Sequence, residues 1–240
     1  MGKLFVIGIG PGNDGLLTFQ AREAIKACEL LCGYHVYTAL IKKYFPDKEY
    51  YETPMGQELE RCRYACEQAR DGRITGMLSS GDSGIYGMAG PVIEMAEEYG
   101  IEAEVVPGIT AAVSGAAKLG APLMNDFCVI SLSDLMTPWE VIEKRLRSAS
   151  VGDFCIVIYN PMSKGRPEHL KKACDIIMEV KDPDTACGYV RNVGREGEEI
   201  HTLTLAELKN SELDMFTTVF IGASNTYISG ARLITGRGYR

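Results

Sequence analysis

Histidine, tryptophan and long apolar segments are scarce in this sequence. Its 240 residues include three histidines and one tryptophan. No uninterrupted apolar run approaches the ~20 residues that a membrane-spanning helix needs. The apolar start runs directly into a glycine loop with no signal-peptide cleavage site after it, and Val6 stands where a myristoylation motif needs Ser or Thr. These absences predict a cytoplasmic protein with no membrane partner.

Extended basic segments are missing as well. The net charge is −7, and the longest basic clusters are Lys42-Lys43 and Lys171-Lys172. A protein that binds a phosphate backbone needs a basic face, so we expect no nucleic-acid partner. A local basic pocket for an acidic small molecule remains compatible with this charge.

The eight cysteines do not show the CxxC spacing of zinc ribbons. Cys62 and Cys66 lie one helical turn apart in an amphipathic segment, which predicts that both face one core. We interpret the cysteines as reduced core thiols and predict no metal site. A metal or iron–sulfur site is the alternative.

Apolar strands and amphipathic helices alternate through the first half of the chain, which predicts a largely parallel sheet covered by helices. In the second half few helices separate the last strands, which predicts a mixed sheet with antiparallel members. The break at residues 120–122 (GAP) favours a lobe boundary in this region. We assign residues 1–114 to one α/β lobe and residues 115–240 to a second. The expected strands are 3–9, 29–32, 73–78, 101–106, 127–132, 154–159, 186–191, 199–203 and 217–221, and the expected helices are 16–28, 57–70, 89–99, 110–119, 139–147 and 167–180.

Residues 10–15 (GPGNDG) match the GxGxxG pattern of a dinucleotide-binding turn, after a strand and before a helix. Two features argue against a nicotinamide-binding oxidoreductase. Pro11 removes one backbone N–H from the loop, and the second strand ends at residues 31–33 (LCG), without the acid that would bind a ribose. A tight turn without a ligand is the other alternative for this loop.

Two more loops follow expected strands, residues 79–87 (SSGDSGIYG) and 107–112 (PGITAA). Glycines let a ligand approach the backbone, and Asp82 offers acceptors. Because ligands bind at the carboxyl ends of parallel strands, the three loops together predict one binding site.

With residues 16–18 (LLT) and 120–123 (GAPL), these loops resemble the tetrapyrrole (corrin/porphyrin) methyltransferase family. The resemblance implies the class III methyltransferase fold, with S-adenosylmethionine in a cleft between two α/β lobes and S-adenosylhomocysteine as product. It also implies a homodimer. The cofactor-binding residues that it implies are Pro11, Gly81, Asp82, Ile85, Thr110 and Ala111 of the first lobe, with Asn160, Asn192 and Ala223 at the corresponding strand ends of the second.

Within this family the chain is similar to the C17-methyltransferases of cobalamin biosynthesis, which act on precorrin-3B or its cobalt-bearing counterpart and contract the ring. Residues 33–37 (GYHVY), 80–90 (SGDSGIYGMAG), 130–139 (ISLSDLMTPW) and 159–163 (YNPMS) carry this likeness. Another acceptor carbon, or a non-catalytic adenosyl-ligand sensor, is the alternative. One position departs from the pattern, because Asn125 stands where a histidine is expected.

Methyl transfer from a sulfonium needs alignment and a dry site more than a catalytic triad. Ring contraction adds a need for an acid or base, for which His35, Asp126 and Asp134 are the candidates. Asp134 is alternatively a helix cap.

The resemblance implies an acidic tetrapyrrole substrate, whose carboxylates oppose the net charge of the chain. Arg191, Arg195, Lys164 and Arg166 follow expected strand ends and are the candidate clamps for these carboxylates. Solvated loop charges are the alternative.

Overall fold

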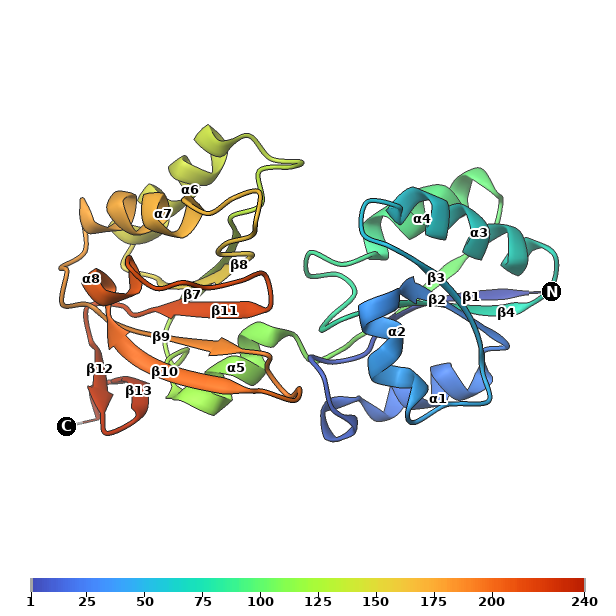
Figure 1. Cartoon of the computed structure of the whole chain (residues 1–240), viewed down its shortest axis with the longest axis horizontal. Helices are drawn as coiled ribbons and strands as arrows, with labels where there is room; N and C mark the ends of the chain where they lie inside the picture. The colour runs from blue at the N-terminus through green and yellow to red at the C-terminus, as the bar shows by residue number, and fades with distance from the viewer. Residues whose placement is uncertain (1, 240) are drawn as a thin grey trace. The chain divides into compact units, whose positions relative to one another are not determined.

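The computed structural model describes residues 2–239, whose contacts form two compact α/β units (Figure 1). Unit 1 ends at Thr110, and unit 2 begins at Ala111 with helix α5 (Ala111–Leu119). The α/β class is confirmed. The boundary expected after residue 114 falls inside α5 and stays a prediction.

Unit 1 is built on a parallel sheet of five strands in the order β3-β2-β4-β1-β5. Every pairing in it is parallel, so all five strands end at one edge. The strands are β1 (Lys3–Gly8), β2 (Leu30–Tyr34), β3 (Glu49–Thr53), β4 (Ile74–Ser79) and β5 (Ala103–Val106), and the α-helices are α1 (Phe19–Ala27), α2 (His35–Lys42), α3 (Glu58–Arg70) and α4 (Ala89–Glu98).

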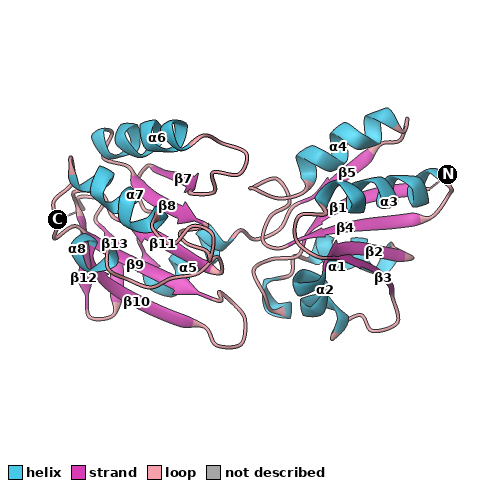
Figure 2. Cartoon of the chain, turned by 45° about the horizontal axis from the view of Figure 1, so that its top comes forward, coloured by secondary structure: helices cyan, strands magenta, loops and turns pink. Residues whose placement is uncertain are grey.

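Helices cover both faces of this sheet (Figure 2). Alternate residues of a strand point to opposite faces, so Ile7 packs with α1 and α2 while Leu4 and Val6 pack with α3 and α4. Cys62 and Cys66 share the second of these cores, as the helical spacing predicted.

The sheet of unit 2 is mixed, as expected, in the order β10-β9-β11-β8-β7. Only its β7–β8 pairing is parallel; β11 runs antiparallel to both β8 and β9. A smaller sheet has the order β12-β13-β6. The remaining elements are β6 (Gly120–Ala121), β7 (Phe127–Ser131), α6 (Trp139–Val151), β8 (Cys155–Tyr159), α7 (His169–Met178), β9 (Ala186–Arg191), β10 (Glu199–Thr204), α8 (Leu205–Leu208), β11 (Thr217–Ile221), β12 (Thr226–Ser229) and β13 (Arg232–Thr235).

Helix α5 packs unusually close to the mixed sheet. A Cβ atom placed on Gly115 would lie 2.9 Å from the Phe220 ring, and one placed on Gly188 would lie 2.8 Å from Leu119. The glycine- and alanine-rich composition of α5 therefore serves a close helix–sheet contact, in agreement with the sequence.

All eight cysteines are free, and seven of them are buried. Burial raises the pKa of the Cys28, Cys155 and Cys174 thiols to about 12, which keeps them protonated and unreactive at neutral pH.

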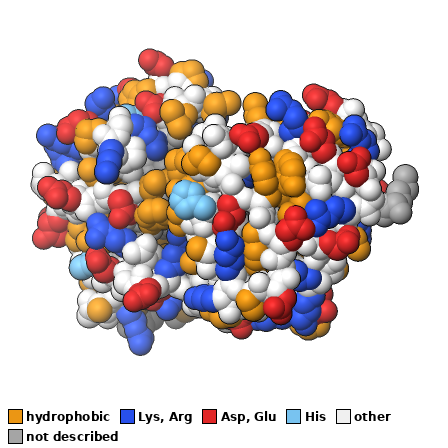
Figure 3. Space-filling model, turned by 45° about the vertical axis from the view of Figure 1, so that its right-hand side comes forward, with side chains coloured by type: hydrophobic (Ala, Val, Ile, Leu, Met, Phe, Trp, Pro, Cys, Tyr) orange, Lys and Arg blue, Asp and Glu red, His pale blue; other side chains and the backbone are white. Residues whose placement is uncertain are grey.

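On the face drawn in Figure 3, acidic and basic side chains are interspersed. Within residues 2–239, no helix has the length and apolar character needed to cross a bilayer.

Candidate functional site

Two glycine loops of unit 1 are joined through their backbones at the carboxyl edge of its sheet. The Gly10 N–H donates to the Gly81 carbonyl over 3.0 Å, and the Gly81 N–H donates back over 2.8 Å. Gly10 has a φ of +72° and Gly81 a φ of +69°, a conformation that glycine adopts without steric cost. Both amides are engaged between the loops, and Pro11 has no N–H to add.

The third loop meets the first two at Gly108. A Cβ atom on Gly108 would lie 2.1 Å from the Gly81 carbonyl oxygen and 2.6 Å from the Gly8 carbonyl carbon. No side chain fits at that distance, so the close approach requires glycine. The convergence of three loops on one edge, predicted from the sequence, is confirmed.

Asp82 ties the second loop to the third. Its Oδ2 accepts the Gly108 N–H at 2.9 Å, and its Oδ1 accepts the Gly84 N–H at 2.8 Å. The carboxylate therefore holds the loops together, a task that the sequence did not reveal. Ile85 lies in the same loop with 39% of its surface exposed, and Thr110 ends the unit.

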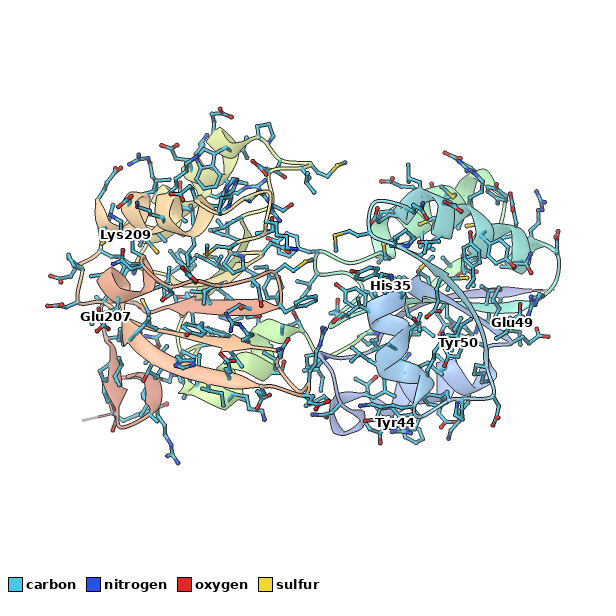
Figure 4. The ribbon with its side chains drawn as sticks, in the orientation of Figure 1. His35, Tyr44, Glu49, Tyr50, Glu207 and Lys209 are labelled. Carbon is cyan, nitrogen blue, oxygen red and sulfur yellow. The ribbon has the colours of Figure 1, made fainter. Side chains whose placement is uncertain are left out.

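His35 is the first residue of α2 and directly follows β2, so it lies at this same edge (Figure 4). Its ring is exposed and packs edge-on against Tyr34 with a centroid distance of 4.5 Å. The structure thus places His35 near the glycine loops, and its role as an acid or base stays a prediction.

Asn160 and Asn192 lie at one edge of the unit 2 sheet. They follow β8 and β9, which run in the same direction because both pair antiparallel with β11. Their φ values are +53° and +52°, a left-handed conformation in which asparagine is enriched. The Asn160 amide donates to Ser131 Oγ over 3.0 Å, and the Asn192 amide donates to the Gly197 carbonyl over 3.3 Å.

Ala223 and Asp126 lie at the opposite edge. Ala223 follows β11, whose end pairs near the start of β8, and Asp126 precedes β7, which starts beside β8 at Cys155. Grouping Ala223 with the two asparagines at one set of strand ends was therefore wrong, because the antiparallel β11 ends at the other edge. Asn125, Asp126 and Ala223 line the same surface hollow of unit 2.

Asp134 pairs with His169, which was not among the candidate residues from the sequence. The His169 Nε2 and Asp134 Oδ2 atoms are 2.9 Å apart, and the His169 ring packs edge-on against Trp139. The hydrogen bond with His169 holds the pKa of Asp134 below its usual range. The interpretation of Asp134 as a helix cap was wrong, because the N-cap residue of α6 is Pro138 and no side chain caps this helix by a hydrogen bond. No sequence spacing links positions 134 and 169; only the fold does.

The four candidate clamps differ in how firmly the protein holds them. Arg191 lies between carboxylates, with Nη1 3.2 Å from Glu199 and Nε 3.4 Å from Asp214. Arg195 stacks over the Phe216 ring, and Arg166 donates to the Leu132 carbonyl. Lys164 is exposed. A substrate carboxylate at Arg191 would compete with two residues of the chain itself.

The sequence matches the family model of the Tetrapyrrole (Corrin/Porphyrin) Methylases over residues 3–209. It is 46% identical to a probable cobalt-factor III C(17)-methyltransferase of Salmonella typhimurium, over 98% of this chain and 99% of that protein. It is 38% identical to a precorrin-3B C(17)-methyltransferase of a Sinorhizobium species, over 95% of this chain and 91% of the relative. Two other relatives are longer, and the chain spans 45% and 53% of their lengths.

Among solved structures, the methyltransferase CobJ is similar over its whole length. The TM-score is 0.90 with 35% identity, covering 98% of this chain and 100% of CobJ. The chain therefore has the same fold as this methyltransferase.

Proposed function

Because the chain belongs to the tetrapyrrole (corrin/porphyrin) methylases, we propose that it is an S-adenosylmethionine-dependent C-methyltransferase of cobalamin biosynthesis. It methylates C17 of cobalt-factor III or precorrin-3B and contracts the ring. The near-complete coverage at 46% identity carries this proposal. The lower identity to the precorrin-3B enzyme favours the cobalt-bearing substrate.

The residues at the carboxyl edge of unit 1 fit an adenosyl ligand. Gly8 and Gly108 lie where backbone meets backbone and no Cβ atom is tolerated, so the three loops pack against one another without side chains between them. Ile85 adds an exposed apolar side chain. We assign cofactor contacts to Pro11, Gly81, Asp82, Ile85 and Thr110 of unit 1, and to Ala111, Asn160 and Asn192 of unit 2; Ala223 is left out because it lies at the opposite edge of the sheet.

When bound, S-adenosylmethionine supplies an activated methyl group on its sulfonium. The chain needs to align the acceptor carbon and exclude water. In this proposal Asp82 fixes the loops that set the alignment. The Asp134–His169 pair lies at the carboxyl edge of the parallel strands β7 and β8 and joins His35 as a candidate for moving a proton during ring contraction.

A nicotinamide-binding oxidoreductase is less well supported. In the dinucleotide fold the second strand lies beside the first, so that its terminal acid reaches the ribose. Here β4 lies between β1 and β2, and β2 ends at Tyr34. The first loop also uses its Gly10 amide for the second loop.

The activity is tested by incubating the protein with labelled S-adenosylmethionine and a panel of tetrapyrroles. We expect one methyl group to be gained by cobalt-factor III or precorrin-3B, detected by mass spectrometry. In parallel calorimetry we expect heat with S-adenosylhomocysteine and none with NAD. Tight NAD binding without S-adenosylhomocysteine binding would overturn the proposal.

The proposal includes a cytoplasmic homodimer. Exposed apolar side chains of unit 2 support a protein contact there; Leu135 is 81% exposed and Met136 is 94% exposed. We expect light scattering at micromolar concentration to give about twice the 26.3 kDa mass of one chain. A monomer mass would contradict this part of the proposal.

A further inference from the structure

Unit 1 contains a small cavity beside the second glycine loop, at the carboxyl ends of β2, β3 and β4. Its volume is about 180 Å³. Sites for whole drug-sized ligands measure roughly 300–1,000 Å³, so this cavity suits one arm of a larger molecule. Aromatic and sulfur-containing side chains form much of its wall, among them Tyr34, Tyr37, Met55 and Met88.

A buried arginine forms part of the same wall. Arg61 of α3 is 3% exposed, and its Nη1 donates to Thr53 Oγ1 and, over 3.1 Å, to the Pro54 carbonyl. Its Nη2 is 3.6 Å from Glu58 Oε1, beyond hydrogen-bond length. Its Nε is buried without a hydrogen-bond partner among the described residues.

The two donors that lack hydrogen bonds, Nε and Nη2, form one edge of the guanidinium group. This edge matches the two oxygens of a carboxylate, which arginine binds through parallel N–H bonds. A buried charge is costly unless it is paired and hydrogen-bonded. Glu58 meets that need only in part, because it forms an ion pair with Nη2 at 3.6 Å but no hydrogen bond, its side chain is 43% exposed, and it accepts the Gly56 N–H.

We propose that this cavity binds a carboxylate-bearing side arm of the substrate, with Arg61 holding the carboxylate and the aromatic wall contacting its methylene groups. The inference rests on the proposed function, since an acidic tetrapyrrole supplies such arms. It adds Arg61 to the candidate cations from the sequence. Glu58 is then a competitor, which a bound carboxylate must displace from the neighbourhood of Nη2.

The test compares Arg61→Met with Arg63→Met, which removes an exposed arginine from the same helix. Methionine fills space in a core, and the charge left on Glu58 is not stranded because its side chain is 43% exposed; thermal melts check folding. For uroporphyrin III we expect the dissociation constant to rise about 10- to 150-fold in Arg61→Met and to stay within about twofold of wild type in Arg63→Met. S-adenosylhomocysteine affinity should stay unchanged in both.

A second variant should change the affinity for uroporphyrin III in the opposite direction. Glu58→Gln removes the competing charge, so uroporphyrin III should bind about two- to fivefold more tightly. The gain should disappear when Glu58→Gln is combined with Arg61→Met; a gain that persists in this double variant reflects general repulsion of an acidic ligand and contradicts the role of Arg61. Coproporphyrin III, which keeps the propionates but lacks the acetates, identifies which arm enters the cavity. If Arg61→Met binds this probe as tightly as the wild type does, the arm is an acetate.

Equal uroporphyrin III affinity in Arg61→Met and Arg63→Met would overturn the inference. If the wild type does not bind uroporphyrin III, glutarate replaces it as the probe, and its binding is measured by saturation-transfer NMR. Equal saturation transfer from Arg61→Met and Arg63→Met to glutarate then overturns the inference. Failure of the wild type to methylate any tetrapyrrole contradicts the proposed function instead.

Discussion

Replacing Gly108 by alanine should weaken S-adenosylhomocysteine binding about 5- to 150-fold and lower the free energy of unfolding by about 1–3 kcal/mol. The added Cβ atom would lie 2.1 Å from the Gly81 carbonyl oxygen and 2.6 Å from the Gly8 carbonyl carbon. Both neighbours are backbone, so the loops themselves must move apart. Calorimetry with S-adenosylhomocysteine and urea unfolding measure the two effects.

Gly90→Ala is the matched control. Gly90 is exposed near the start of α4, and nothing lies within 4 Å of a Cβ atom placed there. Alanine is the better helix former, so stability should be unchanged or slightly higher and binding should be unaffected. If Gly108→Ala binds the ligand as the wild type does, the third loop is not part of the cofactor site.

Replacing Asp153 by asparagine should lower the free energy of unfolding by about 2–3 kcal/mol at neutral pH. Asp153 accepts a 3.0 Å hydrogen bond from Lys181, whose side chain is only 5% exposed. Removing one member of a buried pair leaves the other charge uncompensated, at a cost of about 3–5 kcal/mol when both are buried. The half-exposed Asp153 side chain reduces this figure. Asparagine tolerates the φ of +53° at this position, so the substitution tests the charge.

The double variant Asp153→Asn/Lys181→Met separates the charge from the packing. Because it contains neither charge, we expect it to recover most of the lost stability, and Lys181→Met alone to stay within about 1 kcal/mol of wild type. Additive losses in the double variant would show that the pair does not couple.

Acid should remove the advantage of Asp153. Burial raises the pKa of Asp153, but hydrogen bonds from Ser224 and Lys181 outweigh this effect and hold the pKa below its usual value. A depressed carboxyl pKa contributes stability above the unfolded value of about 3.9 and loses it as the pH falls through the folded value. The gap between wild type and Asp153→Asn should therefore close as the pH falls from the unfolded value of about 3.9 through the lower folded pKa, as measured by urea unfolding at acid and neutral pH.

The sequence was most informative for unit 1, whose sheet is parallel. Strands that alternate with helices end at one edge, so the alternation alone was enough to group the loops after β1, β4 and β5. Glycines in these loops marked the close approach that Gly8 and Gly108 make. In the unit 1 sheet, β3 was missed, because four of its five residues are exposed or half-exposed and they lack a clean alternation.

Strand direction and order were the main limits. Periodicity reports which residues are apolar but not which way a strand runs, so Ala223 was grouped with the wrong edge. Proline also misled at one helix: Pro167 was expected to begin it, whereas α7 begins at His169 with Glu168 as its N-cap. Pairs such as Asp134 with His169, or Arg61 with Thr53, join residues that only the completed fold brings together.

The parallel sheet of unit 1 also sets the order in which that unit is completed during synthesis. β1 leaves the ribosome before both of its partner strands, since Lys3 pairs with Ile74 of β4 and Leu4 pairs with Ala103 of β5. Non-local pairings of this kind form late, because the long intervening chain must first be closed. The glycine loop after β1 can therefore pack against its two partner loops only after they have been synthesised, and the edge that carries the proposed cofactor site is completed only after β5 has been synthesised.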